Sequence, residues 1–515
     1  MRSNRQYGPV AFATPELFRD RPATQEVCII PEIVIGFEVH QPLRLRREFR
    51  HQTTTVTDPD RYFDPINHEI LEKVTDRCYD PATRLILENL DAGHRFAFSF
   101  SGTLIEQLDR WRPDALDLFA QVARHPNCEV LAQTYYHSVA SLFRDKTEFA
   151  RQVYQHMDVL WDIFHVRPTT FENTEFIYSN EIAGLSKDLG FLAAYTEGAP
   201  QILGTRSPNH LYLCSGMPTL LRNTHLSDEI AYRFGGSLSD RHDPKSTLAV
   251  RAYADEVASL QDPLVSVFID YETFGEHFSA ETGVLDFLRE LPGELDARGV
   301  GTTLPRQAIE DHQPEGFLDI TEPISWADHE KDLSAWAGNE MQDVAIAAIQ
   351  KAEAYAHDLE LWRNLQISDH FYYMAMKTHM SGEAHSLFAH QQPAEAFGTY
   401  MEVIAAFMES GIATTRDPKA AWALRVLPPG LAFHFMTPDG RNGHTAYDLD
   451  QFAELVRVVP AESIEYHQSR GDIARWLRDV LGAAEAARRV EGVGSPEGIA
   501  RQLTETREDL WSRLS

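Results

Sequence analysis

The stretch Val265-Ser-Val-Phe-Ile-Asp-Tyr-Glu-Thr-Phe-Gly-Glu-His277 joins an apolar run to a cluster of ionisable side chains. Its first five residues have the β-branched and aromatic composition of a buried parallel strand. The run then ends in Asp270, Tyr271 and Glu272, and a turn follows at Gly275. Charged groups at the end of a buried strand cost free energy unless they have partners or a function. A single Asp in this position most often caps the next helix, but several other strands of this chain end in the same way.

Short apolar runs alternate with longer helical patterns from residue 32 to about residue 310, which is typical of a parallel α/β architecture. The predicted strands are 32–39, 95–100, 129–134, 168–171, 191–195, 211–214 and 264–269. About seven β/α units are too many for a short open sheet, so they indicate a closed or nearly closed barrel. No G-x-G-x-x-G motif follows the first strand, which argues against a dinucleotide-binding fold. In such barrels the active site lies at the carboxyl ends of the strands.

The sequence changes in character after about residue 325. The stretches 340–365 and 397–408 place apolar side chains at helical spacing, which predicts a small helical bundle. A further section begins near Pro428-Pro429-Gly430 and combines a short apolar strand, a turn and several helical patterns. We therefore expect a barrel domain over 1–325, a helical domain over 326–425 that contributes to the active site, and a small α+β or helical module of unknown role over 426–515.

Composition limits the possible partners. The formal charge of −30, from 47 basic and 77 acidic residues, would repel nucleic acids and anionic membranes, so a neutral substrate is favoured. The first 24 residues contain neither a secretory signal nor a membrane span, which predicts a cytoplasmic protein. The four cysteines are widely separated and lack metal-type spacing, as expected of free thiols in a reducing compartment: Cys28, Cys78, Cys128 and Cys214.

Polar residues follow five of the predicted strands. Because the carboxyl ends of parallel strands meet on one rim, these residues should lie close together. Aromatic rings can stack on sugar faces, while carboxylates and imidazoles can hydrogen-bond to hydroxyl groups. The pattern therefore favours a sugar-binding cleft built from His40-Gln41-Pro42, Ser99 to Gly102, Tyr135-Tyr136-His137, Asn173-Thr174-Glu175 and Asp270-Tyr271-Glu272.

Five segments of the chain resemble, in order, the signature regions of glycoside hydrolase family 57, most closely its α-amylase branch. The resemblance covers roughly residues 30 to 410, and five motifs in order are far more specific than the tripeptide His-Gln-Pro alone. The segments are His40-Gln-Pro42, Gln133 to Ser138, Asn173 to Tyr178, Phe268 to His277 and Trp326 to Asn339. Two departures leave the preferred chain length of the substrate open: Gln133 replaces a common acidic residue, and Glu172 replaces a basic or aromatic one.

The resemblance implies an incomplete (β/α)7 barrel that is followed by a helical bundle. It also implies cleavage of α-1,4-glucans with retention of configuration, and neither a metal ion nor a cofactor. Glu175 would be the nucleophile and Asp270 the general acid/base. Carboxyl groups of a retaining pair stand about 5–5.5 Å apart, a gap that strand ends across a barrel mouth can provide. By motif, the substrate-binding residues would be His40, Gln41, Tyr135, His137, Glu272, His277, Asp332 and Trp336.

Three other functions stay open at this point. A 4-α-glucanotransferase or branching enzyme would use the same residues but pass the glucosyl unit to a sugar hydroxyl. A metal-dependent deacetylase or mannosidase on a related barrel would need metal ligands, and no His-x-x-x-His or Asp-Asp-plus-His cluster follows a predicted strand. A non-catalytic glucan-binding protein is disfavoured because Glu175 and Asp270 are both present.

Overall fold

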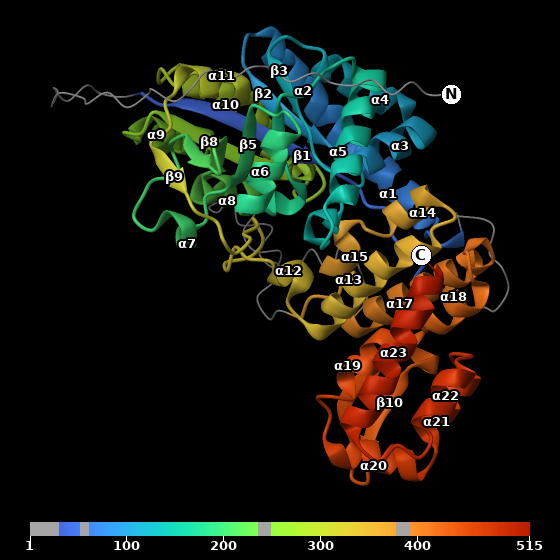
Figure 1. Ribbon diagram of the computed structural model, residues 1–515. Coiled ribbons are helices and arrows are strands. Elements are labelled where there is room, and N and C mark those ends of the chain that lie inside the picture. Colours follow the sequence, from blue (N-terminus) through green and yellow to red (C-terminus); the bar gives the residue numbers. More distant parts are fainter. Residues whose placement is uncertain (1–29, 52–60, 235–248, 377–391, 515) are drawn as a thin grey trace.

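The computed structural model describes residues 30–51, 61–234, 249–376 and 392–514 (Figure 1). Cys28 lies outside these ranges, and the other three cysteines are buried free thiols. Seven parallel strands form the barrel, which confirms the predicted fold class. They are β1 (Glu32–Val39), β2 (Phe96–Phe100), β3 (Cys128–Leu131), β4 (Thr170–Glu172), β5 (Ala193–Glu197), β7 (Met217–Arg222) and β8 (Leu264–Asp270).

The barrel consists of two sheets that meet at two seams. One sheet has the order β3-β2-β1-β8, and the other begins with β4-β5-β7. At the first seam Ala132 exchanges two backbone hydrogen bonds with β4, of 3.0 and 2.8 Å. At the second seam the backbone N–H of Asn223 donates to the carbonyl of Ser266 over 2.7 Å. These sparse connections make the barrel incomplete rather than a continuous ladder.

One predicted strand exists, but its assignment to the barrel was wrong. The run 211–214 does form a strand, β6 (Tyr212–Cys214), but it pairs antiparallel with β7 in a hairpin and carries β9 (Gly316–Leu318) on its other side. The barrel strand is β7, which the sequence analysis did not predict. A tight turn at Ser215 and Gly216, both with positive φ (48° and 78°), joins the two strands of the hairpin.

The side chains of β1 alternate between two cores. Ile33, Ile35 and Phe37 point outward into a core shared with the surrounding helices. Val34 belongs to the interior core of the barrel, together with Phe268 of β8. Gly36 also belongs to the inward series, since a Cβ atom there would lie 2.3 Å from the Phe268 ring. The interior is apolar toward the amino ends of the strands and becomes polar toward their carboxyl ends.

Helices surround the barrel and leave the polar ends of its strands to loops (Figure 1). These helices are α1 (Ile66–Val74), α2 (Asp80–Asp91), α3 (Gly102–Trp111), α4 (Pro113–Ala123), α5 (Thr147–Val159), α6 (Asn180–Asp188), α7 (Pro200–Leu203), α8 (Thr224–Tyr232), α9 (Val250–Ser259), α10 (Val284–Asp296) and α11 (Pro305–Asp311). Gly190, predicted to end a helix, has a left-handed φ of 97° just after α6.

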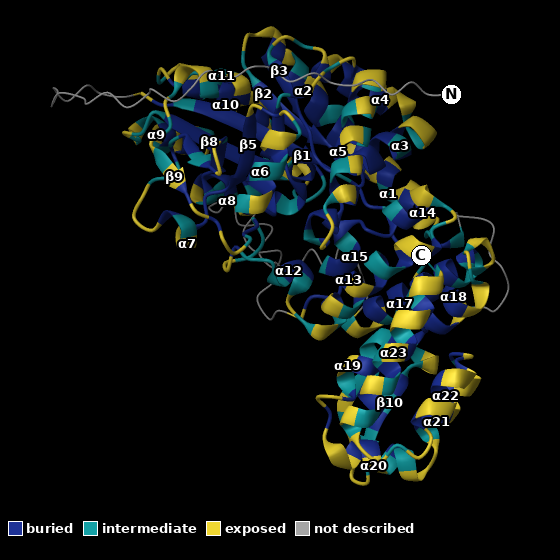
Figure 2. Ribbon diagram, viewed as in Figure 1, coloured by how far each residue is buried: buried dark blue, intermediate teal, exposed yellow. Residues whose placement is uncertain are grey.

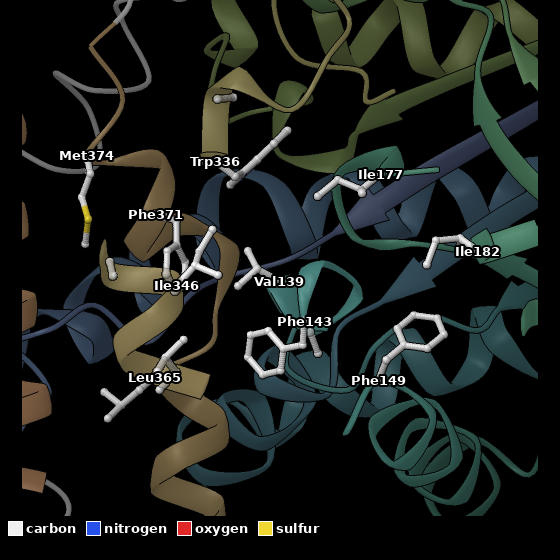
Figure 3. Close-up of a cluster of buried hydrophobic side chains, with 14 of the residues drawn as sticks. Val139, Phe143, Phe149, Ile177, Ile182, Trp336, Ile346, Leu365, Phe371 and Met374 are labelled. Carbon is white, nitrogen blue, oxygen red and sulfur yellow. The ribbon is translucent and has the colours of Figure 1, made fainter. Parts of the chain in front are cut away.

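A helical region follows and shares one hydrophobic core with the barrel. It comprises α12 (Ser334–Ala337), α13 (Glu340–Ala352), α14 (Leu359–Asn364), α15 (Ser368–Tyr372), α17 (Pro393–Gly411) and α18 (Pro418–Leu424). Figure 3 shows Ile346 and Phe371 of this region next to Val139 of a barrel loop, and Leu365 and Ile177 belong to the same core. The apolar stripe predicted over 340–365 is divided between two helices, because the chain turns at 353–358.

The last part of the chain has a core of its own, visible as buried segments in Figure 2. An antiparallel hairpin of β10 (Phe433–Thr437) and β11 (Gly440–Ala446) packs against α19 (Leu449–Leu455), α20 (Ala461–Ser469), α21 (Asp472–Asp479), α22 (Ala484–Val490) and α23 (Pro496–Leu514). Phe433, Phe435, Phe452 and Trp476 form the aromatic centre of this core. Among the described residues, no helix is both long and apolar enough to cross a membrane.

Candidate active site

A cavity of about 230 Å³ opens at the carboxyl ends of the barrel strands. Loops of the barrel and residues of α8, α12 and α15 line it together. All but two of the site residues predicted from the sequence belong to this lining: His40, Gln41, His137, Glu175, Asp270, Glu272, His277 and Trp336.

Glu175 lies just after β4 in an unusual backbone conformation. Its φ of 60° and ψ of 20° are left-handed, which is uncommon for a residue other than glycine and costs free energy. Two side chains fix its carboxyl group. The indole Nε1 of Trp326 donates to Oε2 over 2.8 Å, and the Ser368 hydroxyl donates to Oε1 over 2.9 Å. These two hydrogen bonds hold the carboxyl group in a defined orientation.

Asp270 is the last residue of β8, and its carboxyl group favours the protonated form. Burial and the nearby charge of Glu175 raise its pKa from 3.8 to about 7, although Arg222 opposes this shift. Arg222 is itself held by three hydrogen bonds: to the Phe268 carbonyl (2.8 Å), to Glu197 (2.9 Å) and to Asp228 (2.7 Å). The cavity therefore combines an oriented carboxylate with a carboxyl group that keeps its proton up to about neutral pH.

Two histidines stack beside Glu175, with ring centroids 4.2 Å apart. The Nε2 atom of His40 lies 3.2 Å from Asp369, and its Nδ1 lies 2.7 Å from the hydroxyl of Ser101. Burial, reinforced by the charge of His137, lowers the pKa of His40 to about 4, so the ring is neutral at neutral pH. The tautomer that fits both contacts donates from Nε2 to Asp369 and accepts from Ser101 at Nδ1.

His137 differs from its stacked partner in charge. Its Nε2 lies 3.6 Å from Glu175 Oε1, and its backbone is also left-handed, with φ of 48°. Burial lowers the pKa of His137, but contacts with Glu175 and Glu38 outweigh this effect and raise the pKa to about 9. The ring is therefore an imidazolium at neutral pH, with one N–H directed at the Glu175 carboxylate.

Glu272 and His277 line the cavity after β8 but differ in their bonding. Glu272 Oε1 accepts a short hydrogen bond from the Tyr79 hydroxyl and a longer one of 3.3 Å from the backbone N–H of His40. Burial raises the pKa of Glu272 to about 8, whereas burial lowers the pKa of His277 to about 4. The backbone carbonyl of Gln41 accepts a hydrogen bond of 2.6 Å from the side-chain amide of Gln107, which holds Gln41 in place.

Two predicted substrate-binding residues do not line this cavity. The ring of Tyr135 packs against Gly102, where a Cβ atom would come within 2.6 Å, and its hydroxyl donates to Glu106 over 2.6 Å. The Asp332 carboxylate accepts from the backbone N–H of Ser334 over 2.8 Å, at the start of α12. Trp336 is almost completely buried beside the cavity, and its indole N–H meets no hydrogen-bond acceptor among the residues that the structure describes.

Sequence reasoning missed several residues of the cavity. Ser368 and Asp369 come from α15, far along the chain from the strand ends, and only the fold brings them to Glu175 and His40. Arg222 is the last residue of β7, the strand that was not predicted. The available signal for Arg222 was a charged residue directly after the apolar pair Leu220-Leu221. Trp326 did lie at the start of a recognised motif. Within the described ranges, no three His, Cys, Asp or Glu side chains gather in a way that could hold a metal ion.

Comparison with known proteins places the chain in a family. Residues 34–321 match the model described as glycosyl hydrolase family 57. A Methanocaldococcus jannaschii protein, described as "Putative alpha-amylase", is 36% identical over 393 residues, which cover 72% of this chain and 83% of that protein. Two solved branching enzymes of the same family, from Thermococcus kodakaraensis and Pyrococcus horikoshii, align with TM-scores of 0.54 and 0.55 at 13% and 15% identity. Each alignment covers 74% of this chain, with 91% and 90% of those chains, and shows the shared fold. From the family match and the M. jannaschii relative, this chain belongs to glycosyl hydrolase family 57.

Proposed function

We propose that the protein cleaves α-1,4-glucosidic bonds of starch, glycogen or maltodextrins with retention of configuration, and that Glu175 and Asp270 perform the chemistry. The main support for this proposal is that two carboxyl groups lie in the same cavity but in different environments. Glu175 is oriented by two hydrogen-bond donors, whereas Asp270 keeps its proton to about pH 7. A retaining glycosidase needs this combination of nucleophile and acid. The M. jannaschii relative, described as "Putative alpha-amylase", supports the α-glucan substrate.

In the first step, the Glu175 carboxylate attacks the anomeric carbon while Asp270 gives its proton to the departing glucosidic oxygen. This forms a covalent glycosyl-enzyme through an oxocarbenium-like transition state. In the second step, ionised Asp270 removes a proton from the incoming hydroxyl as that oxygen displaces Glu175. The loss of charge on Glu175 during the covalent stage also removes one cause of the raised pKa of Asp270, which makes its ionised form easier to maintain.

The remaining cavity residues would bind the sugar on either side of the bond. His40 and Asp369 form a fixed donor–acceptor pair, and both line the cavity with Gln41. The buried indole N–H of Trp336 needs an acceptor, and a glucose hydroxyl would supply one. Glu272 and His277 are substrate-side residues in this proposal. Tyr135 and Asp332 would act indirectly, since neither side chain reaches the cavity.

The decisive experiment measures turnover of maltoheptaose by three variants. Glu175→Gln and Asp270→Asn should each lower turnover by several orders of magnitude with the fold retained. Glu88→Gln is the matched control, because this carboxyl group is exposed on α2 and does not line the cavity. Near-normal activity of either cavity variant would refute the assignment. In the same reactions, products longer than seven units would identify a sugar acceptor, as in a glucanotransferase or branching enzyme. Only shorter products would identify water.

A further inference from the structure

A second cavity lies between the barrel and the helical region. Its volume is about 610 Å³, against about 230 Å³ for the catalytic cavity, and a cavity of this size can hold a small-molecule ligand. Helices α1 and α3 of the barrel and α14 of the helical region line it. Among the described residues, none lines both cavities, so the second cavity is separate from the catalytic one.

The loop after β1 forms a wall between the two cavities. Pro42 and Arg44 line the catalytic cavity, whereas Leu43 and Arg46 line the second one. The side chain of Asn67, which lines the second cavity, holds this wall in place by accepting from the backbone N–H of Arg44 over 3.0 Å. The wall is one chain segment thick, so a ligand in the second cavity would lie next to the catalytic cavity.

The lining of the second cavity includes three buried polar atoms that have no hydrogen-bond partner among the described residues. They are the amide oxygens of Gln107 and Asn364 and the Nε atom of Arg46. Both amide nitrogens donate to backbone carbonyls, Gln107 to Gln41 over 2.6 Å and Asn364 to Glu360 over 3.2 Å, which fixes the orientation of the amides. Each amide side chain is only 3% exposed, and an unpaired buried oxygen costs free energy. A ligand with hydrogen-bonding groups would remove this cost once the side chains rotate toward it.

The partners that these atoms lack indicate a ligand rich in hydroxyl groups. The amide oxygens need donors and the guanidinium N–H needs an acceptor, and a hydroxyl group can serve as either. The indole of Trp111 and the side chain of Leu361 add apolar surface, on which the C–H face of a sugar can pack. The charged residues of the lining have both signs, which favours a neutral ligand over an ion: Asp64, Glu106, Asp358, Glu360, Arg46 and Arg110.

We propose that the second cavity binds a segment of α-glucan and so holds long chains next to the catalytic cavity. The inference rests on the proposed function, since the same neutral polysaccharide would enter both cavities. A chain held at the second cavity raises the local concentration of its other glucosidic bonds at Glu175 and Asp270. Long substrates therefore gain affinity from this site, whereas a short oligosaccharide fills only one cavity at a time.

Trp111 is the residue to change in a test, because the fold offers a matched control. Its ring lies 5.2 Å from the ring of His68 and 5.3 Å from an arginine guanidinium. Trp161, just after α5, has neighbours of the same kinds, with His165 at 6.0 Å and an arginine guanidinium at 4.4 Å. Trp161 is 45% exposed and lines neither cavity. Trp111→Ala and Trp161→Ala therefore remove the same ring from comparable surroundings.

The test measures binding and rate separately. Calorimetric titration of maltotetraose into Glu175→Gln, which should bind without turnover, is expected to give two bound molecules per chain. Adding Trp111→Ala should weaken one of the two binding events about three- to tenfold. In the otherwise unchanged protein, Trp111→Ala should raise the KM for amylose by a similar factor, with kcat retained and with both constants for maltotetraose retained. Trp161→Ala should change none of these values.

Equal effects of the two tryptophan variants, or an equal rise in KM for amylose and maltotetraose, would overturn the inference. If Trp111→Ala does not fold, Asn364→Ala makes the same comparison, because it removes one of the unpaired oxygens. A protein that cleaves amylose but binds only one maltotetraose per chain would refute the second site alone. A protein that neither cleaves nor binds these glucans would refute the proposed function as well.

Discussion

Replacing Asp270 by Asn should stabilise the fold in alkaline solution while abolishing turnover. The pKa of Asp270 is about 7 in the folded protein, against 3.8 ordinarily, because burial and Glu175 disfavour its charge. Below pH 3.8 both the folded and the unfolded states are protonated, so the group has no effect on stability. Between pH 3.8 and 7 the unfolded state loses the proton first, so stability falls as pH rises. Above pH 7 the folded protein bears the full free-energy cost of holding Asp270 in its ionised form.

The size of this effect follows from the shift in pKa. A difference of about three units corresponds to about 4 kcal/mol. Asp270 is partly exposed to the cavity, and water reduces the penalty, so we expect Asp270→Asn to gain about 2–4 kcal/mol at pH 8.5. At pH 4.5 the gain should shrink to about 1 kcal/mol or less, because the folded carboxyl is protonated there and the unfolded one is only partly ionised.

Urea denaturation at pH 4.5 and 8.5, followed by fluorescence, measures the difference. Asp369→Asn is a control of opposite sign. Burial raises the pKa of Asp369, but the hydrogen bond from His40 and the positive charge of His137 outweigh this effect and lower the pKa to about 2. Its ionised form therefore stabilises the fold above the ordinary pKa, and its removal should cost about 2 kcal/mol at pH 8.5. A gain for Asp270→Asn that is equal at both pH values, or a loss at pH 8.5, would refute the reasoning.

Three further predictions concern rate and packing. The kcat/KM of the unchanged protein should fall tenfold per pH unit above a midpoint near pH 7, as Asp270 loses its proton; an activity plateau extending to pH 9 in initial-rate measurements would contradict this. Trp326→Phe removes the 2.8 Å hydrogen bond to the nucleophile and should lower kcat by about 10- to 100-fold, and an unchanged kcat would show that the bond is dispensable. Gly36→Ala should destabilise the barrel by about 1–3 kcal/mol, since its Cβ would overlap a phenyl ring of β8. Gly184→Ala on α6, where the added Cβ meets no neighbour, should instead be neutral or stabilising in thermal unfolding, and equal effects at the two glycines would count against the packing argument.

The sequence predicted the parts of the fold that depend on local pattern. The predicted bounds of β1, 32–39, agree with the structure because the run from Ile33 to Phe37 has no polar side chain and Pro31 precedes the strand. By contrast, β7 was missed because Pro218 interrupts its apolar pattern and the strand pairs locally with β6. The serine–glycine pair at 215–216, which forms the tight turn between them, was the signal for this hairpin.

The candidate site, like the fold, could be predicted only in part from the sequence. Residues at strand ends could be grouped from the sequence, because parallel strands bring their carboxyl ends to one rim. Ser368 could not be grouped with them, since its place beside Glu175 depends on how α15 packs against the barrel. Glu38 was also overlooked, although a Glu within an otherwise apolar strand is costly enough to require a reason.

His137 and Glu175 both have left-handed backbone conformations, so the active site lowers the stability of the fold that holds it. Each non-glycine residue in this conformation costs roughly 1–3 kcal/mol, and neither is replaced by the glycine that would relieve the cost. Selection for stability alone would favour glycine at both positions, yet a glycine carries neither a nucleophile nor an imidazole. We therefore expect a protein of this fold that lacks the reaction to tolerate glycine at these two positions, whereas an active one needs both side chains and carries the backbone strain.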